Sequence, residues 1–504
     1  MREKDAHWQD SADIVIAGYG GAGAVAAITA HDLGADVVLV EKQPGDAHYT
    51  NTQLSGGIFL SPSEVEEAVE YMEALYQVDG DLSWTDRDTL RAWAEYTHQN
   101  REWVEKLGGK LKPWGHRGGP YRQIPGWECL EVWRIAGSGL GLHRFLTSNV
   151  AQRGIRVLFD APAQRLIAND DGEVVGVRVL EGEARVPKDI RVRRAVILTT
   201  GGFSFDETMK LNYLKIYPAY FAGTPANTGD GIRMAQDLGA DLWHMNCAAG
   251  RVVAKFPEFP FAFYVDFGGG DSMLRQTSAE AREKRARPVG YILVDRDGRR
   301  FTSENIKSHS LIYELGVYDS HRLIFPRVPC FWIFDQRRMD AGPLVSVAGG
   351  PCGPVQLYRW SRDNLAELDK GWIVKGESIA ELAGKLELPA DTLTETAERY
   401  STYCHQGLDP DFHRLSEDLE PVTGPPYYGM RLFPGGASTL GGPRRNHRAQ
   451  VLKVDGNPIP RLYAAGELGS TYGMLYPSGG GNLADCIAFG RIAAENAVRE
   501  TPWP

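Results

Sequence analysis

The sequence of 504 residues has no run of apolar residues long enough to span a bilayer, which takes roughly 18. Its first residues, MREKDAHWQDSAD, are charged and lack the apolar core of a secretory signal. Lysine and arginine form no long basic run, and the formal net charge is −10. A nucleic-acid or anionic-membrane surface needs clustered cations. We therefore expect a cytoplasmic protein with no membrane span and no nucleic-acid partner.

Cysteine is also sparse, and no internal repeat or low-complexity segment is present. The six cysteines form no CxxC pair and show no spacing typical of a metal site. They are Cys129, Cys247, Cys330, Cys352, Cys404 and Cys486. We expect buried or surface thiols, with no disulfide and no metal.

Glycine, in contrast, is arranged in a recognisable pattern near the N-terminus. The apolar residues 13–17 precede GYGGAG at 18–23, which is followed by AVAAITAHDLGA at helical spacing and by the apolar run DVVLVEK. This order predicts a strand, a glycine turn, a helix and a second strand.

The residues of this turn have the spacing of a dinucleotide-binding motif. Gly18 would allow the tight turn, Gly20 would let the backbone approach a pyrophosphate, and Gly23 would let the helix pack against the strand. Glu41 ends the second strand, where a carboxylate can accept hydrogen bonds from adenosine ribose hydroxyls. The motif predicts dinucleotide binding.

A second glycine run lies near the C-terminus, in the stretch 463–490. Glu467, Tyr476 and Ser478 come before the glycines at 479–481, and a helix of small residues follows them. The positive end of a helix dipole and its N–H groups can hold the anionic edge of a buried ring. We expect both ends of the chain to belong to one layered α/β domain.

The middle of the chain has a different character. Residues 154–180 alternate around DDGE and predict a hairpin or meander, and 193–203 predict a buried strand. A strand and turn at 291–301 and an amphipathic helix near 379–406 suggest an inserted cap domain. The expected domains are an FAD-binding domain in two parts, 1–245 and 429–504, and a cap or substrate domain, 246–428.

Residues 84–133 contain six tryptophans around a glycine and proline loop. They are Trp84, Trp93, Trp103, Trp114, Trp127 and Trp133. These residues either form helix core with a surface loop, or form an aromatic loop that walls an apolar ligand pocket. The sequence leaves both interpretations open.

Several motifs resemble those of one flavoprotein superfamily, and they occur in its order. They are EK at 41–42, NTQLSGG at 51–57, TTGGF at 199–203, NTGDGIRMAQDLGAD at 227–241 and the stretch 463–490. The sequence resembles the fumarate reductase and 3-ketosteroid dehydrogenase superfamily. The resemblance implies a mixed α/β and α+β fold, in which a Rossmann-like FAD-binding domain carries an inserted α+β cap domain.

The resemblance also implies the residues that contact FAD. They are Gly18, Gly20, Ala22, Gly23, Glu41, Lys42, Asn51, Thr52, Gly56, Gly57, Ala163, Asp230, Glu467 and Leu483. Asp230 and Glu467 could instead be helix caps or surface charges. Some relatives attach FAD covalently to a histidine before the paired glycines. Thr50 occupies that place here and His48 lies two positions earlier, so we expect non-covalent FAD.

Three positions argue against a dicarboxylate substrate, which needs fixed cationic donors. Where fumarate-reducing relatives have a histidine and two arginines, this sequence has Ser438, Ser478 and Ser308. The Tyr-Pro-Ser-Gly-Gly segment at 476–480 instead resembles the ketosteroid dehydrogenases. That resemblance implies that the Tyr476 hydroxyl and the Gly480 N–H bind a ketone oxygen. Tyr476 could also be a core tyrosine, and Ser478 could assist at the site or serve as a helix N-cap.

The base of the reaction is not at the place that the resemblance implies. Ketosteroid dehydrogenases carry a second tyrosine after their RFxNE-like turn, where this chain has Lys307 or Ser308. The available replacements are His309, Lys307, Tyr313 and Tyr121. His309 is our first candidate because histidine titrates near neutrality, and Tyr121 from the aromatic loop is the second.

We expect an FAD-dependent dehydrogenase that introduces a C=C bond α,β to the carbonyl of an apolar cyclic ketone, either a 3-ketosteroid or a cyclohexanone-like ring. It would require an external electron acceptor. The alternative is an enone or enoate reductase of the fumarate or urocanate reductase type. A third interpretation is a protein that retains FAD without turnover. The sequence is compatible with an oligomer.

Overall fold

The structure is a computed structural model that describes residues 1–114, 118–268, 289–304 and 309–503. The chain forms two compact units. The first contains Met1–Met209, Thr224–Ala248 and Ser438–Pro504, and the second contains Lys210–Gly223 and Ala249–Ala437. The sequence did not suggest that residues 210–223 group with the second unit. The expected domain boundaries stay a prediction.

A parallel sheet is the centre of the first unit. Its strands lie in the order β22 (Pro458–Ala464), β11 (Val186–Leu198), β1 (Trp8–Ala17), β2 (Val37–Val40) and β8 (Arg156–Leu158). All five strands end in register. Ala17 pairs with both Val40 and Leu198, Leu198 pairs with Ala464, and Val40 pairs with Leu158. Their carboxyl ends therefore meet at one edge, where ligands bind in open α/β sheets.

Antiparallel strands extend this sheet. β9 (Ala163–Ala168) and β10 (Val174–Glu181) form a hairpin, and β10 pairs with β11. The hairpin or meander predicted for residues 154–180 is thus present. β21 (Gln450–Leu452) pairs antiparallel with β22, at the opposite end of the strand order from β8.

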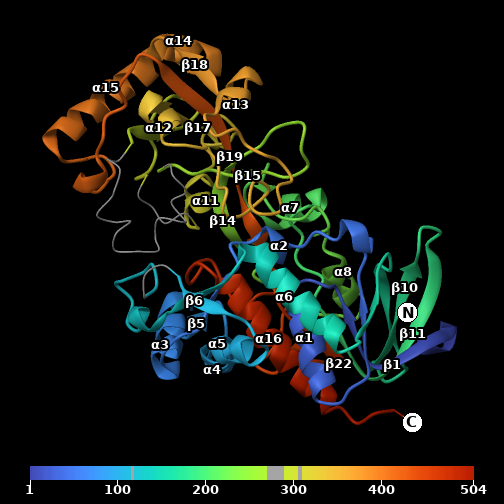
Figure 1. Cartoon of the computed structure of the whole chain (residues 1–504). Helices are drawn as coiled ribbons and strands as arrows, with labels where there is room; N and C mark the ends of the chain where they lie inside the picture. The colour runs from blue at the N-terminus through green and yellow to red at the C-terminus, as the bar shows by residue number, and fades with distance from the viewer. Residues whose placement is uncertain (115–117, 269–288, 305–308, 504) are drawn as a thin grey trace. The chain divides into compact units, whose positions relative to one another are not determined.

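Two helices of small residues pack against each other in the first unit. α1 (Gly21–Asp32) and α16 (Gly481–Val498) make extensive contact, and α6 (Ser138–Gln152) also contacts α1 (Figure 1). Most residues of α1 and α16 are buried, and glycine and alanine let the two backbones approach closely. The helices predicted after the two glycine runs are therefore both present.

Short elements complete the first unit. Its other helices are η1 (Glu3–Asp5), η2 (Gly45–Ala47), α2 (Asn51–Leu54), α3 (Val65–Tyr76), α4 (Arg87–His98), α5 (Asn100–Lys106), η3 (Trp127–Cys129) and α8 (Asp230–Gln236). Its other strands are β3 (Ile58–Leu60), β4 (Gln77–Asp79), β5 (Leu82–Ser83), β6 (Leu111–Pro113), β7 (Val132–Ile135), β13 (Leu242–Trp243) and β20 (Gly442–Pro443). α7 (Glu207–Tyr213) crosses the division between the units.

The second unit contains a mixed sheet. Its strands are β15 (Phe263–Tyr264), β14 (Ala248–Ala254), β19 (Tyr427–Thr439), β17 (Cys330–Asp335) and β16 (Tyr291–Val294), in that order, with β12 (Tyr220–Phe221) and β18 (Val374–Gly376) paired to β19. Its helices are α11 (Leu311–Glu314), α12 (Gln336–Asp340), α13 (Leu365–Asp369), α14 (Ile379–Leu386), α15 (Ala390–Gln406) and η4 (Ser416–Asp418).

The amphipathic helix predicted near residues 379–406 is two helices. α14 ends where Glu387 adopts a left-handed φ of 62°, and Pro389 precedes the first residue of α15. Proline lacks the N–H that would continue a helix, so the chain turns there. Both helices bury apolar side chains such as Leu382 and Leu393 in one core with Ile292 and Ile333 of the sheet.

Candidate active site

A cavity opens at the sheet edge of the first unit. It lies beside the ends of β1, β2, β11 and β22, and the turn after β1 forms part of its wall. Gly18 has φ +104°, and a Cβ there would lie 2.5 Å from the Thr199 carbonyl oxygen. Only glycine permits this turn.

The other two glycines of the motif differ in the space around them. A Cβ on Gly23 would lie 2.0 Å from the Gly18 carbonyl oxygen, so α1 starts directly against the turn. A Cβ on Gly20 would meet no atom within 4 Å. Gly20 lines the cavity, so its bare backbone leaves room for a ligand. This arrangement has the spacing needed for a pyrophosphate at the start of α1.

Glu41 follows β2 and is 6% exposed. Its carboxylate accepts hydrogen bonds from the Tyr19 and Gln43 backbone N–H groups, each at 2.9 Å, and lies 3.5 Å from the His48 ring. Burial raises the pKa of Glu41, but His48 and the two N–H groups outweigh burial and lower the pKa below its usual value. Glu41 is therefore a fixed anion at the cavity wall.

A cation lies at the same wall. The Lys42 ammonium donates to the Thr228 hydroxyl and to the Asp230 carboxylate, both at 2.7 Å. Asp230 is the first residue of α8, whose N-cap is Gly229, so its side chain does not cap that helix. Lys42 and Asp230 both line the cavity.

Glu467 lies at another part of the wall, in the turn after β22. Its carboxylate accepts hydrogen bonds from the side-chain amides of Asn51 (2.7 Å) and Asn227 (3.1 Å). Burial raises the pKa of Glu467 to about 7, although these amides and other donors oppose the increase. A carboxyl group that titrates near neutrality can accept or donate a hydrogen bond to a bound hydroxyl.

Most of the residues predicted to contact FAD line this cavity. They are Gly18, Gly20, Ala22, Glu41, Lys42, Asn51, Thr52, Ala163, Asp230 and Glu467. Four predicted residues lie outside its lining: Gly23, Gly56, Gly57 and Leu483. The role of each residue toward FAD stays a prediction.

Several other residues line the cavity that the sequence did not predict. They include Tyr19, Gln43, Thr199, Gly201, Thr224 and Asn227. Thr199, Gly201 and Asn227 lie within the motifs TTGGF and NTGDG, so the motifs could have indicated them. Tyr19 lies within the motif GYGGAG, so that motif could have indicated it. Thr224 lies outside every motif, and only the fold brings it to the wall.

His48 and Thr50 occupy distinct positions around the cavity. The His48 ring stacks on Tyr19, with centroids 5.4 Å apart, and lies against Glu41. Thr50 caps α2, accepts from the Gln53 N–H at 3.2 Å and lines the cavity. A threonine at this place has no nucleophilic ring nitrogen, which is compatible with the prediction of non-covalent FAD.

The residues of the cavity fit FAD. The open backbone at Gly20 suits a pyrophosphate, and the ionised Glu41 suits ribose hydroxyls. Glu467 and Asn51 offer carboxyl and amide groups for further hydroxyls along an extended ligand.

Tyr476 lies five residues before the first residue of α16, Gly481, and is 6% exposed. Its hydroxyl oxygen accepts a hydrogen bond from the Asn482 backbone N–H at 2.6 Å. The Tyr472 ring lies edge-on to it, with centroids 5.6 Å apart, and the Tyr472 hydroxyl donates to the Gly481 carbonyl at 2.7 Å. The phenol of Tyr476 is thus tied to the positive end of the helix dipole.

The structure gives different results for the residues predicted to act with Tyr476. Gly480 is the N-cap of α16 with φ +90°, so the interpretation of Ser478 as the N-cap is wrong. The helix begins two residues later because only glycine adopts this conformation readily. Ser438 accepts from the Asn482 side-chain amide at 2.6 Å, so a neutral pair stands where relatives have a histidine.

The two candidate bases lie in different units. Tyr121 is in the first unit and is 9% exposed. His309 is in the second unit, where its Nε2 accepts from the Arg251 guanidinium at 3.2 Å. Burial and the Arg251 charge lower the pKa of His309 well below its usual value, so the ring is neutral. Lys307 and Ser308 lie outside the described residues, and Tyr313 belongs to α11 of the second unit.

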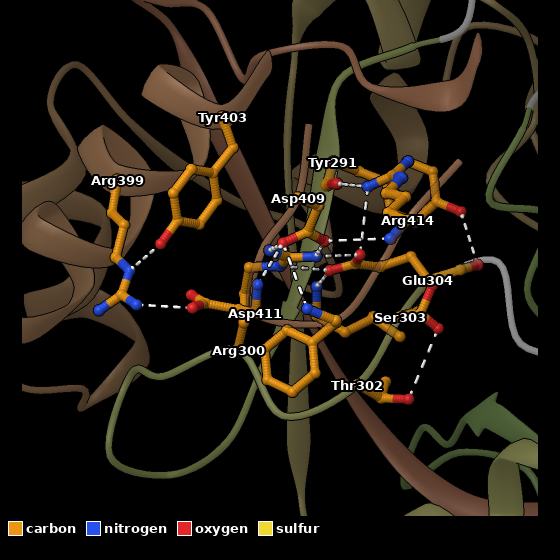
Figure 2. A network of polar contacts seen from close by, with 12 residues as sticks. Tyr291, Arg300, Thr302, Ser303, Glu304, Arg399, Tyr403, Asp409, Asp411 and Arg414 are labelled. Carbon is orange, nitrogen blue, oxygen red and sulfur yellow. Dashed lines mark hydrogen bonds and ion pairs between the residues drawn. The ribbon is translucent and has the colours of Figure 1, made fainter. Parts of the chain in front are cut away.

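A buried charged network precedes His309 in the second unit (Figure 2). The Arg300 guanidinium donates to the carboxylates of Glu304 and Asp409, each at 2.8 Å, and Arg414 lies 3.3 Å from Glu304. All four side chains are at most 4% exposed. Arg300 and Glu304 begin and end the RFTSE turn, so the network fixes the shape of this turn.

Comparison with known proteins agrees with this geometry. Residues 13–483 match the family described as FAD binding domain. The chain belongs to this family. It is 27% identical to a 3-oxosteroid 1-dehydrogenase of Mycolicibacterium smegmatis, covering 96% of each chain. It is 28% identical to a 4-oxocyclohexanecarboxylate 2-dehydrogenase of Sinomonas cyclohexanicum, covering 92% of this chain and 75% of that one.

A solved structure has the same fold. The 3-ketosteroid delta1-dehydrogenase of Sterolibacterium denitrificans, in complex with 1,4-androstadiene-3,17-dione, superposes with a TM-score of 0.81 at 23% identity. The match covers 97% of this chain and all of that one. The predictions of a flavoprotein fold, of FAD as cofactor and of an oxidoreductase are confirmed. The protein is an FAD-dependent oxidoreductase that acts on CH–CH bonds.

The sequence also predicted that the chain has no membrane span. Across the described ranges, no helix is both long enough and apolar enough to cross a bilayer.

Proposed function

We propose that this flavoprotein converts a saturated apolar cyclic ketone into the α,β-unsaturated ketone, with Tyr476 and Gly480 binding the ketone oxygen. The observation that carries the proposal is the Tyr476 phenol, tied by the Asn482 N–H to the start of α16 and placed four residues before the helix N-cap Gly480. Named relatives act on a 3-oxosteroid and on 4-oxocyclohexanecarboxylate, and both substrates carry a ketone on a six-membered ring.

The chemistry follows from where negative charge develops. Removing the α-proton places charge on the ketone oxygen, and the Tyr476 O–H and Gly480 N–H are neutral donors that would stabilise it. The Asn482 N–H donates to the phenol oxygen. In the proposed reaction the Tyr476 hydroxyl donates its proton to the ketone oxygen. One such donor is worth about 2.7–4 kcal/mol. Bound FAD supplies the acceptor for the hydride that leaves the β-carbon.

The substrate loses one proton and one hydride, so a base and an external electron acceptor are required. We propose Tyr121 as the base, ahead of His309, because the His309 Nε2 already accepts a hydrogen bond from Arg251. Tyr121→Phe should slow turnover at least tenfold, since base catalysis contributes about 10²–10⁴-fold. A matched His309→Gln enzyme that is slower than Tyr121→Phe would reverse this assignment.

Anaerobic bleaching tests the reaction itself. The purified yellow holoenzyme should lose its flavin absorbance when given 3-ketosteroids or 4-substituted cyclohexanones, and should regain it with an artificial acceptor. Succinate should cause no bleaching, because Ser438 and Ser478 offer no cation to a second carboxylate. If the ketones leave the spectrum unchanged but enones reoxidise dithionite-reduced enzyme, the protein is a reductase and the proposed direction is wrong.

Tyr476→Phe tests the proposed oxyanion site. The FAD content should be unchanged, and kcat should fall about 100-fold, which corresponds to the loss of one oxyanion donor. The control is Tyr463→Phe, another buried phenol, whose hydroxyl donates to Glu500 at 2.7 Å. Unchanged turnover in Tyr476→Phe would remove this residue from the mechanism.

A further inference from the structure

Two tyrosines of α3 hold the backbone on either side of Tyr476. The Tyr76 hydroxyl donates to the Leu475 carbonyl and the Tyr71 hydroxyl donates to the Pro477 carbonyl, both at 2.9 Å. Both tyrosines are 0% exposed. The two carbonyl groups flank Tyr476 directly, so α3 sets the path of the chain that carries this phenol.

The chain around Tyr476 has no regular secondary structure that would fix it otherwise. Residues 473–478 belong to no helix or strand, and Pro477 has no backbone N–H to donate. Geometry in such a segment depends on side chains that bind its carbonyl groups. A buried hydroxyl without its acceptor costs about 1–3 kcal/mol, so both tyrosines favour the arrangement observed.

Tyr71 also contacts the loop that carries Tyr121. Burial raises the pKa of Tyr71, the neighbouring Tyr121 phenol raises it further, and a hydrogen bond from the Tyr121 backbone opposes the increase. A Cβ on Gly119 would lie 2.7 Å from the Tyr71 hydroxyl, so this loop lies directly against α3. One tyrosine hydroxyl therefore touches both segments that carry our proposed catalytic phenols.

Tyr76 lies in the same group of phenols. Burial raises its pKa well above the usual value, and Tyr71, Tyr121 and Tyr476 each raise it further. These tyrosines all belong to the first unit, although they are up to 405 positions apart in the sequence. α3 is thus the common support of the two segments.

We propose that Tyr71 and Tyr76 are positioning residues of the ketone site, which hold Tyr476 and the Tyr121 loop in their reactive arrangement without touching the substrate. The inference rests on the proposed function of Tyr476. Each hydroxyl fixes one carbonyl next to Tyr476, and Tyr71 additionally fixes the loop at Gly119 and Tyr121. Phenylalanine keeps each ring and its packing and removes only the hydroxyl.

Single variants separate positioning from folding. In Tyr76→Phe and Tyr71→Phe, kcat should fall about tenfold, which corresponds to one hydrogen bond to a buried carbonyl, while KM and FAD content change less than twofold. The enzyme should also bind 4-nitrophenolate, a stable mimic of an enolate, about tenfold more weakly, read from the shift of its absorbance. Tyr463→Phe is the matched control, and its turnover and phenolate binding should equal those of the parent enzyme.

A double-mutant cycle with Tyr476→Phe gives the decisive result. If Tyr76 acts through the Tyr476 hydroxyl, adding Tyr76→Phe to Tyr476→Phe should reduce kcat by less than twofold. A further tenfold loss in the double variant, or single variants with the parent's kcat, would overturn the inference and leave the proposed function intact. If Tyr476→Phe itself keeps full turnover, the proposed function fails first.

Discussion

Burial and hydrogen bonding act in opposite directions on the pKa of Glu467. The Asn51 and Asn227 amides stabilise its charged form, yet burial dominates and raises the pKa to about 7. Near neutral pH the cofactor-free protein therefore holds this group in both protonation states. A hydroxyl of bound FAD would meet either a donor or an acceptor there.

This shift predicts how the stability of the cofactor-free protein depends on pH. The usual pKa is 4.5 and the folded pKa is about 7. Between these values the folded state binds more protons than the unfolded state, so the free energy of unfolding falls as pH rises. Glu467→Gln should flatten this slope, measured by urea unfolding at intervals from pH 5 to pH 7.5. A variant with the parent's full slope would contradict the assignment to Glu467.

Single residues differ in how far the sequence predicts them. Gly18, Gly20 and Glu41 could be assigned because their spacing follows one strand, one turn and the next strand. Tyr71 and Tyr76 could not, because their acceptors lie 406 and 399 residues away. Every residue has a backbone carbonyl, so the residue type of the acceptor does not show that its carbonyl accepts a hydrogen bond.

At the scale of elements, the charged network of the second unit joins two turns, at residues 300–304 and 409–414. Two arginines face two carboxylates, so the buried charges cancel. Burial alone raises the pKa of Asp409, and the Arg300 guanidinium reverses that effect and holds it below its usual value. The network therefore stabilises the turns only while it is complete.

Glu304→Gln should destabilise the second unit by about 3–5 kcal/mol, because it leaves an arginine charge buried without its partner. The matched control is Asp297→Asn, which breaks a solvent-exposed pair with Arg322 and should cost less than about 1 kcal/mol. Chemical denaturation of both variants measures the difference. Equal, small losses in the two variants would show that the buried network contributes little.

Helix and strand boundaries show where element prediction succeeds. Residues 13–40 follow the expected order because hydrophobic periodicity and glycine agree over the whole segment. The helix expected near 379–406 breaks into α14 and α15, since Glu387 turns left-handed before Pro389. Amphipathic periodicity continues across the break, so the pattern alone hides it.

At the scale of the whole molecule, cofactor binding and folding are coupled. The cavity is lined by segments from all three stretches of the first unit, as at Gly18, Asn227 and Glu467. A ligand that binds only this folded arrangement stabilises it by about 2.7 kcal/mol at 100 times its Kd. The free energy of unfolding of the first unit should therefore be markedly lower without FAD.

Thermal unfolding of cofactor-free protein across a series of FAD concentrations tests this coupling. The melting temperature should rise steadily with the logarithm of FAD concentration, because free energy depends on the logarithm of ligand concentration. Riboflavin, which lacks the pyrophosphate and adenosine, serves as the control and should give a much smaller increase. A melting temperature independent of FAD would mean that the cavity does not bind it.

The sequence predicted the FAD-binding fold better than it predicted which segments belong to each of the two units. The glycine motifs at both ends indicated that they share a domain, and β11 indeed pairs with both β1 and β22. No sequence pattern indicated that residues 210–223 belong to the second unit. A short segment packs with whichever neighbours bury it, and its own residues do not identify those neighbours.

The first unit is completed by its last residues, and this sets a constraint during synthesis. β1 and α1 leave the ribosome early, yet α16 and β22 follow more than 400 residues later. Chains grow at about 5–20 residues per second, so the buried face of α1 stays uncovered for tens of seconds. A chain that terminates early would expose this face permanently and become a target for chaperones and proteases.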